Sequence, residues 1–134
     1  MQNEPLVSIV TPSFNQARFL EQAIKSVIGQ DYPNIEYFVI DGGSTDGSVD
    51  IIKAYASGIT SWVSERDRGQ ADGINKGLRK CKGEIVAWLN SDDRYTPGAI
   101  RRAVQAYQAH KEASFIFSDV ESIDCRGNGF NLMR

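Results

Sequence analysis

The sequence has few of the residues that bind transition metals or build disulfide scaffolds. It holds one histidine, His110, and two cysteines, Cys81 and Cys125, which lie far apart. These counts exclude a disulfide-rich fold and a zinc site made of cysteine or histidine, and they favour a reducing compartment. They also argue against acid–base chemistry through histidine, so carboxylates, glycine-rich turns and the backbone are left for chemistry.

An excess of positive charge and long apolar runs are also absent. Fifteen Lys and Arg against 17 Asp and Glu give a formal net charge of −2, which argues against a dedicated nucleic-acid-binding protein. No apolar run approaches the roughly 20 residues that span a bilayer, and no charged-then-apolar leader opens the chain. With 134 residues, 41% of them hydrophobic, the sequence predicts one globular domain over residues 1–134.

Segments typical of strands and of helices alternate along the chain. The predicted strands are residues 6–11, which should stop at Pro12, then 35–40, 60–63, 84–89 and 114–117. The predicted helices are residues 19–28, capped by Asn15, then 48–56, 70–80 and 97–110. This alternation predicts an α/β fold with a Rossmann-like, mostly parallel sheet that carries helices on both faces. No obvious closing element follows, so we expect the chain to be part of a longer domain.

Two pairs of residues carry packing predictions. Gly73 and Gly77 lie four residues apart in a predicted helix, where each costs about 1 kcal/mol relative to alanine. Such a pair indicates that the helix backbone comes close to a neighbour or a ligand. Trp62 and Trp88 lie in strand patterns, and we expect them in the core because large aromatic side chains bury much area.

Three of the predicted strands end in acidic residues: Asp41, then Asp92 with Asp93, and finally Asp119. Ligands of open parallel sheets bind beyond the carboxyl ends of the strands. We therefore expect these carboxylates to meet along one edge of the sheet. Aspartate is also common at such turns as a cap, but three acidic strand ends together favour a site.

The acidic pair in Asn90-Ser91-Asp92-Asp93 carries the sharpest prediction. Two adjacent carboxylates repel each other, and their burial without compensation is costly. A divalent cation removes that cost. Because no histidine or cysteine lies nearby, the oxygen ligands favour Mg²⁺ or Mn²⁺, which also bind substrate phosphates.

Three further motifs have both a structural and a functional interpretation. The first runs from Asp41 to Ser48, and its glycines would let the backbone approach a ligand or make a tight loop; it has neither P-loop nor GxGxxG spacing. The second is Thr11-Pro-Ser-Phe-Asn, where Phe14 could stack on a base or serve as a helix staple. The third is the charged segment 65–77, which is a solvated face or part of a site.

These motifs, in this order, resemble the inverting family 2 glycosyltransferases of the GT-A fold. The four segments are TPSFN, DGGSTDGS, ERDRGQADGINKG and GEIVAWLNSDD, and the match runs from about Val7 to Asp119. Each motif alone is modest, but four in order at these intervals are specific. The resemblance implies a nucleotide-diphospho-sugar donor such as a UDP-sugar, a divalent metal, and a saccharide or lipid-linked acceptor.

The resemblance also implies roles near the nucleotide. Thr11, Pro12 and Phe14 would line the base pocket, although family members often have tyrosine where Phe14 stands. Asp41 would face the uracil or the ribose. Many members have a second acid next, where this chain has Gly42.

The remaining roles implied by the resemblance lie further along the chain. Asp67, Asp72 and Asn75 match a helix-start motif near the donor. Asp92 would contact the ribose and take part in the metal site, and Asp93 would bind the metal on the pyrophosphate, as in the family's variant of the DXD motif.

The reaction implied by the resemblance is sugar transfer with inversion to an acceptor hydroxyl, whose proton passes to a carboxylate base. In the family that base lies in the acceptor-binding half, which we expect beyond residue 134, so no residue is assigned to it. We expect the isolated chain to bind nucleotide but to transfer sugar poorly. We also expect a cytoplasmic role in cell-envelope polysaccharide synthesis, with any membrane association made through other parts of a longer protein.

Two other functions stay open. One is a different Mg²⁺-dependent nucleotidyl or phosphoryl transferase, for which Arg66 and Arg68 are candidate phosphate ligands, although the first strand ends in Thr11 rather than aspartate. The other is a non-catalytic nucleotide- or sugar-binding module. Metal-dependent UDP binding that Asp93→Ala abolishes would favour the glycosyltransferase, and metal-free binding of a sugar would favour the module.

Overall fold

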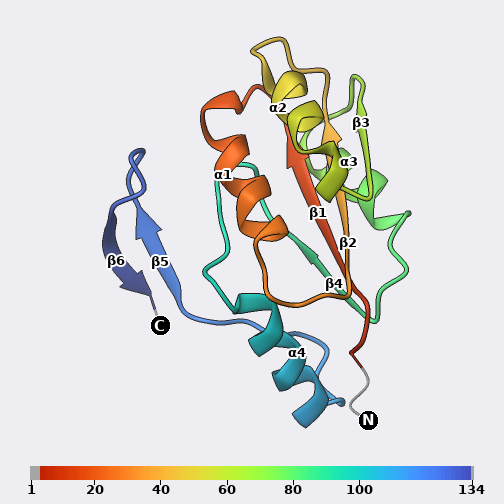
Figure 1. Ribbon diagram of the computed structural model, residues 1–134, viewed down its shortest axis with the longest axis vertical. Helices are drawn as coiled ribbons and strands as arrows, with labels where there is room; N and C mark the ends of the chain where they lie inside the picture. Colours follow the sequence, from red (N-terminus) through yellow and green to blue (C-terminus); the bar gives the residue numbers. More distant parts are fainter. Residues whose placement is uncertain (1–3, 134) are drawn as a thin grey trace.

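The computed structural model describes residues 4–133. The strands are β1 (Val7–Ser13), β2 (Ile35–Asp41), β3 (Ser61–Ser64), β4 (Ile85–Trp88), β5 (Val120–Ile123) and β6 (Gly129–Met133). The helices are α1 (Ala17–Ile28), α2 (Ser48–Ala54), α3 (Gln70–Leu78) and α4 (Ala99–Ala109), with a short 3-10 turn, Ala56–Gly58, after α2. Figure 1 shows these elements along the chain.

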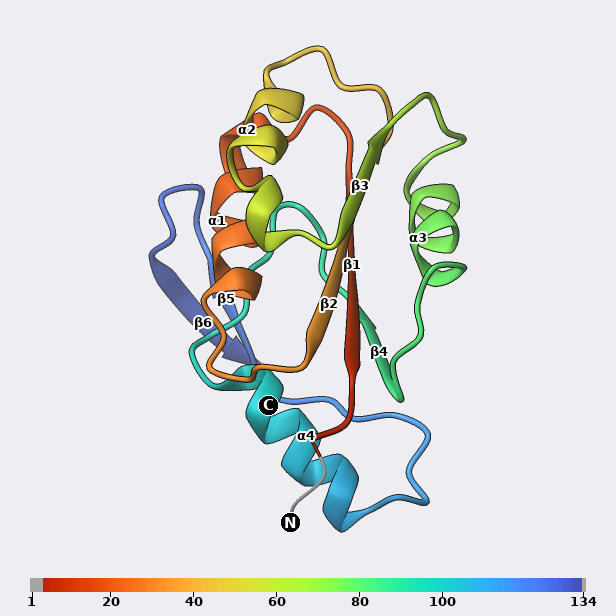
Figure 2. The ribbon, with the colours of Figure 1, turned by 45° about the vertical axis from the view of Figure 1, so that its right-hand side comes forward.

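The main sheet has the strand order β3-β2-β1-β4, and its neighbouring strands are parallel. Helices α1 and α2 cover one face and α3 covers the other, as Figure 2 shows with the sheet seen nearly edge-on. Strands β5 and β6 form a separate antiparallel hairpin beyond α1. The predicted α/β fold with a mostly parallel sheet and helices on both faces is confirmed.

Residues of β1 and β2 alternate between two apolar cores, because successive strand side chains point to opposite faces. Val7, Ile9 and Val39 pack with α1, α2 and α4. Val10 and Phe38 pack in the smaller core on the α3 side. Both central strands are therefore buried on both faces, as their continuous apolar sequence predicts.

Helix α3 comes very close to the sheet at Gly77, whereas at Gly73 the separation is an ordinary van der Waals distance. A Cβ on Gly77 would lie 2.3 Å from a methyl carbon of Val10, and one on Gly73 would lie 3.5 Å from Cβ of Pro12. The predicted close backbone approach is confirmed, and the neighbour is β1.

Pro12 does not end the first strand, contrary to the prediction. It pairs in register with Ile40, and β1 continues to Ser13. The carbonyl of Val10 accepts from Leu89 N on the β4 side, so Pro12, two residues on, faces that side too. The β1–β4 pairing has ended there, so the missing N–H of Pro12 interrupts no ladder bond.

The predicted strand 84–89 forms as β4, but the predicted burial of Trp88 and the predicted strand at residues 114–117 were wrong. Strand β4 alternates in burial, and Trp88 is 57% exposed, because α3 packs over β1 and β2 and leaves β4 open; Trp62, in contrast, packs partly buried against the core. Residues 114–117 form no strand, and the side chains of Phe115 and Phe117 are exposed. The apolar and aromatic residues of this segment are typical of a strand, but a strand also needs a neighbouring strand to pair with.

Candidate functional site

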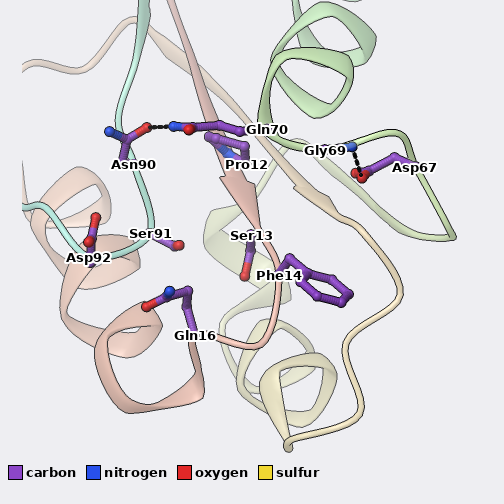
Figure 3. Close-up of a pocket in the computed structure, with 10 residues that line it drawn as sticks. All are labelled: Pro12, Ser13, Phe14, Gln16, Asp67, Gly69, Gln70, Asn90, Ser91 and Asp92. Atoms are coloured by element: carbon purple, nitrogen blue, oxygen red, sulfur yellow. Dashed lines mark hydrogen bonds between the residues drawn. The ribbon is translucent and has the colours of Figure 1, made fainter.

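A pocket of about 260 Å³ lies at the edge of the sheet where the parallel strands end. Its lining comes from the end of β1, from the segments that follow β1, β3 and β4, and from the start of α3. Figure 3 shows these residues. The lining residues are Pro12, Ser13, Phe14, Gln16, Asp67, Gly69, Gln70, Asn90, Ser91 and Asp92. Residues at or after the ends of three of the four strands therefore meet at this edge, but of the strand-end acids predicted to meet there only Asp92 lines the pocket.

The segment after β1 supplies an aromatic wall. Phe14 is 59% exposed and lines the pocket, as does Pro12. Thr11, in contrast, is fully buried beneath them, and its Oγ1 shares a 2.7 Å hydrogen bond with the hydroxyl of Tyr37. Burial raises the pKa of Tyr37 well above its usual range, so this pair stays neutral and supports the strand from inside.

Asn15 does not cap α1, contrary to the prediction. It has a left-handed backbone, with φ of 50°, and its Oδ1 accepts from Thr45 N at 2.9 Å. Asp46 serves the helix start instead: its Oδ2 accepts from Ala17 N at 3.0 Å, while its Oδ1 accepts from Ser48 N and Oγ. One carboxylate thereby holds the beginnings of α1 and α2 together, and these hydrogen bonds hold the pKa of Asp46 below its ordinary value.

Asp41 lies at the end of β2 but is completely buried. Its carboxylate accepts hydrogen bonds from Gly43 N, from the backbone and hydroxyl of Ser44, and from Ser64 Oγ at 2.7 Å. These partners make it the organiser of the loop between β2 and α2, and it is not among the pocket-lining residues.

Asp67, which follows β3, does line the pocket. Its Oδ1 accepts from Gly69 N at 2.9 Å, just before α3. The other two residues predicted from this motif lie elsewhere: Asp72 accepts from Arg68 N at 3.0 Å, and Asn75 is exposed one turn further along α3. The structure brings neither Asp72 nor Asn75 to the pocket lining.

Asp92 belongs to two pockets, because it also lines a second one of about 210 Å³ together with Asp93. Loss of hydration and the neighbouring charge of Asp92 raise the pKa of Asp93, while a weak hydrogen bond from Asn90 opposes the shift. The two carboxylates therefore leave negative charge that a cation would compensate. Adjacent carboxylates are oxygen ligands of the kind that Mg²⁺ and Mn²⁺ prefer.

The second pocket lies between α1, the Asp92-Asp93 turn and the β5–β6 hairpin. Arg94 connects these parts, donating to Gln22 Oε1 at 3.0 Å and to the Gly127 carbonyl at 2.9 Å. Asp124 lines this pocket, but backbone N–H groups of Asn128 and Arg126 occupy its carboxylate and lower its pKa.

The predicted convergence of Asp41, of Asp92 with Asp93, and of Asp119 is not seen. Asp41 is enclosed in its loop while Asp93 lines the second pocket, so the two do not face a shared cleft. Asp119 lies before β5, exposed, and lines neither pocket, because the strand expected to carry it to the edge does not form. Within residues 4–133 no group of three or more His, Cys, Asp or Glu side chains is arranged to hold a metal ion.

Sequence reasoning missed the neutral polar side chains of the pocket. Ser13, Gln16 and Ser91 line it, and Gln70 donates to Asn90 Oδ1 across it. Each lies within or beside a motif that the sequence analysis singled out. Their closeness in sequence to these motifs was therefore the one signal that could have identified them. Their residue types alone did not distinguish them from ordinary loop residues.

The parallel strand order β3-β2-β1-β4, with helices on both faces, is an α/β arrangement of the GT-A type. The chain belongs to Glycosyl transferase family 2, whose match covers residues 8–131. It is 39% identical over 108 residues to an uncharacterized glycosyltransferase of Mycobacterium tuberculosis, covering 79% of this chain and 41% of that protein. It is 32% identical to TuaG of Bacillus subtilis, a glycosyltransferase provisionally named for teichuronic acid biosynthesis, covering 86% and 46% of the two chains.

Solved structures agree on the fold. Staphylococcus aureus TarS 1–349 in complex with UDP-GlcNAc superposes with a TM-score of 0.72 at 23% identity, over 79% of this chain and 32% of that one. The mannosyltransferase PcManGT of Pyrobaculum calidifontis, in complex with GDP-Man and Mn²⁺, gives a TM-score of 0.71 at 29% identity, over 78% and 33%.

The chain spans less than half of the length of these relatives. Among the described residues, no helix is long and apolar enough to cross a membrane.

Proposed function

We propose that this chain binds the nucleotide-diphospho-sugar donor of an inverting, metal-assisted glycosyltransferase. The observation that carries the proposal is the pocket at the strand ends, which places the exposed Phe14 ring on one side and Asp92 on the other, with Asp93 next in sequence. An aromatic face suits a base, and adjacent carboxylates suit a cation on a pyrophosphate.

Asp92 and Asp93 are the residues that would hold Mg²⁺ or Mn²⁺. The adjacency of the two carboxylates supports this assignment: loss of hydration and the charge of Asp92 raise the pKa of Asp93. The Mn²⁺ in the mannosyltransferase relative supports it too. When bound, the ion would supply neutralisation of the charge that develops on the leaving nucleoside diphosphate.

The protein's own residues would orient the donor. Phe14 would stack on the base, and Pro12 with Asp67 would form the adjoining wall of the pocket. Asp41, saturated by its hydrogen bonds, would keep the loop from Gly43 to Ser48 fixed, and any contact of Asp41 with base or ribose would require a change in that loop.

The acceptor half of the reaction also belongs to this proposal. A saccharide or lipid-linked hydroxyl would attack the anomeric carbon from the face opposite the nucleotide, after giving its proton to a carboxylate outside residues 1–134. The name of the TuaG relative supports a role in cell-envelope polysaccharide synthesis. A cytoplasmic location, at the inner face of a membrane in a longer protein, agrees with the two free cysteines.

Calorimetric titration with UDP, with and without Mn²⁺, tests the proposal. The wild-type chain should bind UDP in a metal-dependent manner, and Asp93→Ala should abolish that dependence. Asp50→Ala is the matched control, since Asp50 is an exposed aspartate in α2 outside both pockets. Binding of a free sugar without metal would indicate a non-catalytic module, and equal binding of ATP or NAD would contradict a nucleotide-sugar site.

A further inference from the structure

We propose that the hydroxyl of Ser13 binds a ribose hydroxyl of the donor nucleotide, an inference that depends on the proposed function. Ser13 is the last residue of β1 and lines the pocket, yet its side chain is only 5% exposed. Within the part of the chain that the structure describes, its Oγ is the one buried side-chain nitrogen or oxygen without a hydrogen-bond partner.

A buried hydroxyl without a partner is unfavourable in the free protein. Folding removes it from water and returns no hydrogen bond, and native structures leave few such groups. The backbone holds it there, because the Ser13 carbonyl accepts from Gly42 N at 2.8 Å and fixes the strand end. A group that enters the pocket and bonds this oxygen would relieve the cost, so the site is prepared for a polar ligand.

Ser8, on the same strand, shows the ordinary state of a buried serine. It is fully buried, and its hydroxyl donates to Glu36 Oε2 at 2.5 Å and accepts from Gly83 N at 2.8 Å. The same residue type in the same strand is therefore satisfied away from the pocket and unsatisfied within it. Burial alone does not explain the state of Ser13.

The position of Ser13 selects the part of the nucleotide. Figure 3 shows its hydroxyl between the Phe14 ring on one side and Asp92 on the other, with the Ser91 hydroxyl facing it. If the base stacks on Phe14 and the pyrophosphate lies near the acidic pair, the ribose lies between them. A serine hydroxyl both donates and accepts, which suits a ribose hydroxyl.

The test compares ligands and variants. Calorimetry with Mn²⁺ measures UDP, 2′-deoxy-UDP and 3′-deoxy-UDP against wild type and Ser13→Ala. We expect Ser13→Ala to weaken UDP binding about two- to tenfold, the range for one neutral hydrogen bond. It should not weaken binding of the deoxy analogue that lacks the contacted hydroxyl. Ser13→Cys, close in size but a weaker hydrogen-bonding group, should show the same pattern.

Thermal unfolding separates this role from a structural one. Ser13→Ala should unfold at the same or a higher temperature than wild type, whereas the control Ser8→Ala should unfold lower and bind UDP normally. Unchanged UDP affinity in Ser13→Ala, equal losses for all three nucleotides, or a loss of stability like that of Ser8→Ala would overturn the inference while leaving the proposed function intact. Absence of UDP binding by the wild type would overturn both.

Discussion

The carboxylate of Asp67 lies against Gly42, so close that a Cβ on Gly42 would be 2.9 Å from Asp67 Oδ2. Gly42 immediately follows the buried Asp41, and Asp67 lines the pocket at the strand ends. The absence of a side chain at residue 42, where the family resemblance leads one to expect a second acid, is thus what leaves space for the Asp67 carboxylate. The loops after β2 and β3 are fitted to each other at this contact.

Gly42→Ala should weaken UDP binding by about three- to tenfold, because the new methyl group displaces the Asp67 carboxylate from the pocket wall. Calorimetry with Mn²⁺ measures the change. The double variant Gly42→Ala with Asp67→Ala should bind no more weakly than Asp67→Ala alone, since both changes act through the same carboxylate. Additive losses would show that Gly42 acts independently of Asp67.

Phe14→Ala should weaken UDP binding by about 1–3 kcal/mol, the range for loss of a stacking contact with a base. Stability should change little, because the ring is largely exposed in the free protein. Phe14→Tyr keeps the aromatic face and should bind UDP at least as well as wild type. Calorimetry and chemical unfolding together check this prediction, and an unchanged affinity for Phe14→Ala would place the base elsewhere.

Gly77→Ala should lower the free energy of unfolding by about 1–3 kcal/mol. Alanine favours helix by about 1 kcal/mol over glycine, but here its methyl group would overlap the side chain of Val10 in a packed core. Gly73→Ala in the same helix is the matched control: its nearest contacts, at 3.4 and 3.5 Å, leave space. Urea unfolding should therefore show Gly73→Ala near or above wild type.

Asp46→Ala should cost about 1 kcal/mol at neutral pH, the usual effect of losing a helix cap. Its hydrogen bonds hold the folded-state pKa of Asp46 below the ordinary value of 3.8. The stabilisation is therefore present above that value and is lost as the pH falls through the folded-state pKa. In urea titrations the difference in unfolding free energy between wild type and variant should stay constant from about pH 6 to pH 5 and shrink as the pH falls to about pH 2. A difference that stays constant over this whole range would exclude a charged cap.

The fold was largely predictable, since the short, continuously apolar runs of β1 and β2 and the helical pattern of α1 depend on local sequence and burial. Residues 114–117 were not, because their strand character lacks a neighbouring strand among residues 4–133. The predicted end of the first strand at Pro12 was wrong for a related reason. The missing N–H of a proline breaks a strand only where a neighbouring strand would pair with it, and sequence does not show where that pairing ends.

The location of the pocket was predictable, but most of the residues that line it were not. The acidic motif led to Asp92 and the topology to the correct edge of the sheet. Sequence could not show that serine hydroxyls and backbone amides would enclose Asp41, since that depends on how one loop closes on itself. Nor could sequence show that the hydroxyl of Ser8 has hydrogen-bond partners and that of Ser13 has none, because the partners of Ser8 lie far away along the chain.

The loop between β2 and α2 is joined to the residue that follows Phe14 by two reciprocal bonds. Ser44 Oγ accepts from Asn15 N at 2.8 Å, and Asn15 Oδ1 accepts from Thr45 N at 2.9 Å. These bonds hold the backbone beside Phe14 in place in the free protein, so little backbone freedom would be lost if the proposed nucleotide bound there. The loop between β2 and α2 and the segment after β1 therefore hold each other in place. Shortening one of them would remove these bonds and loosen the other.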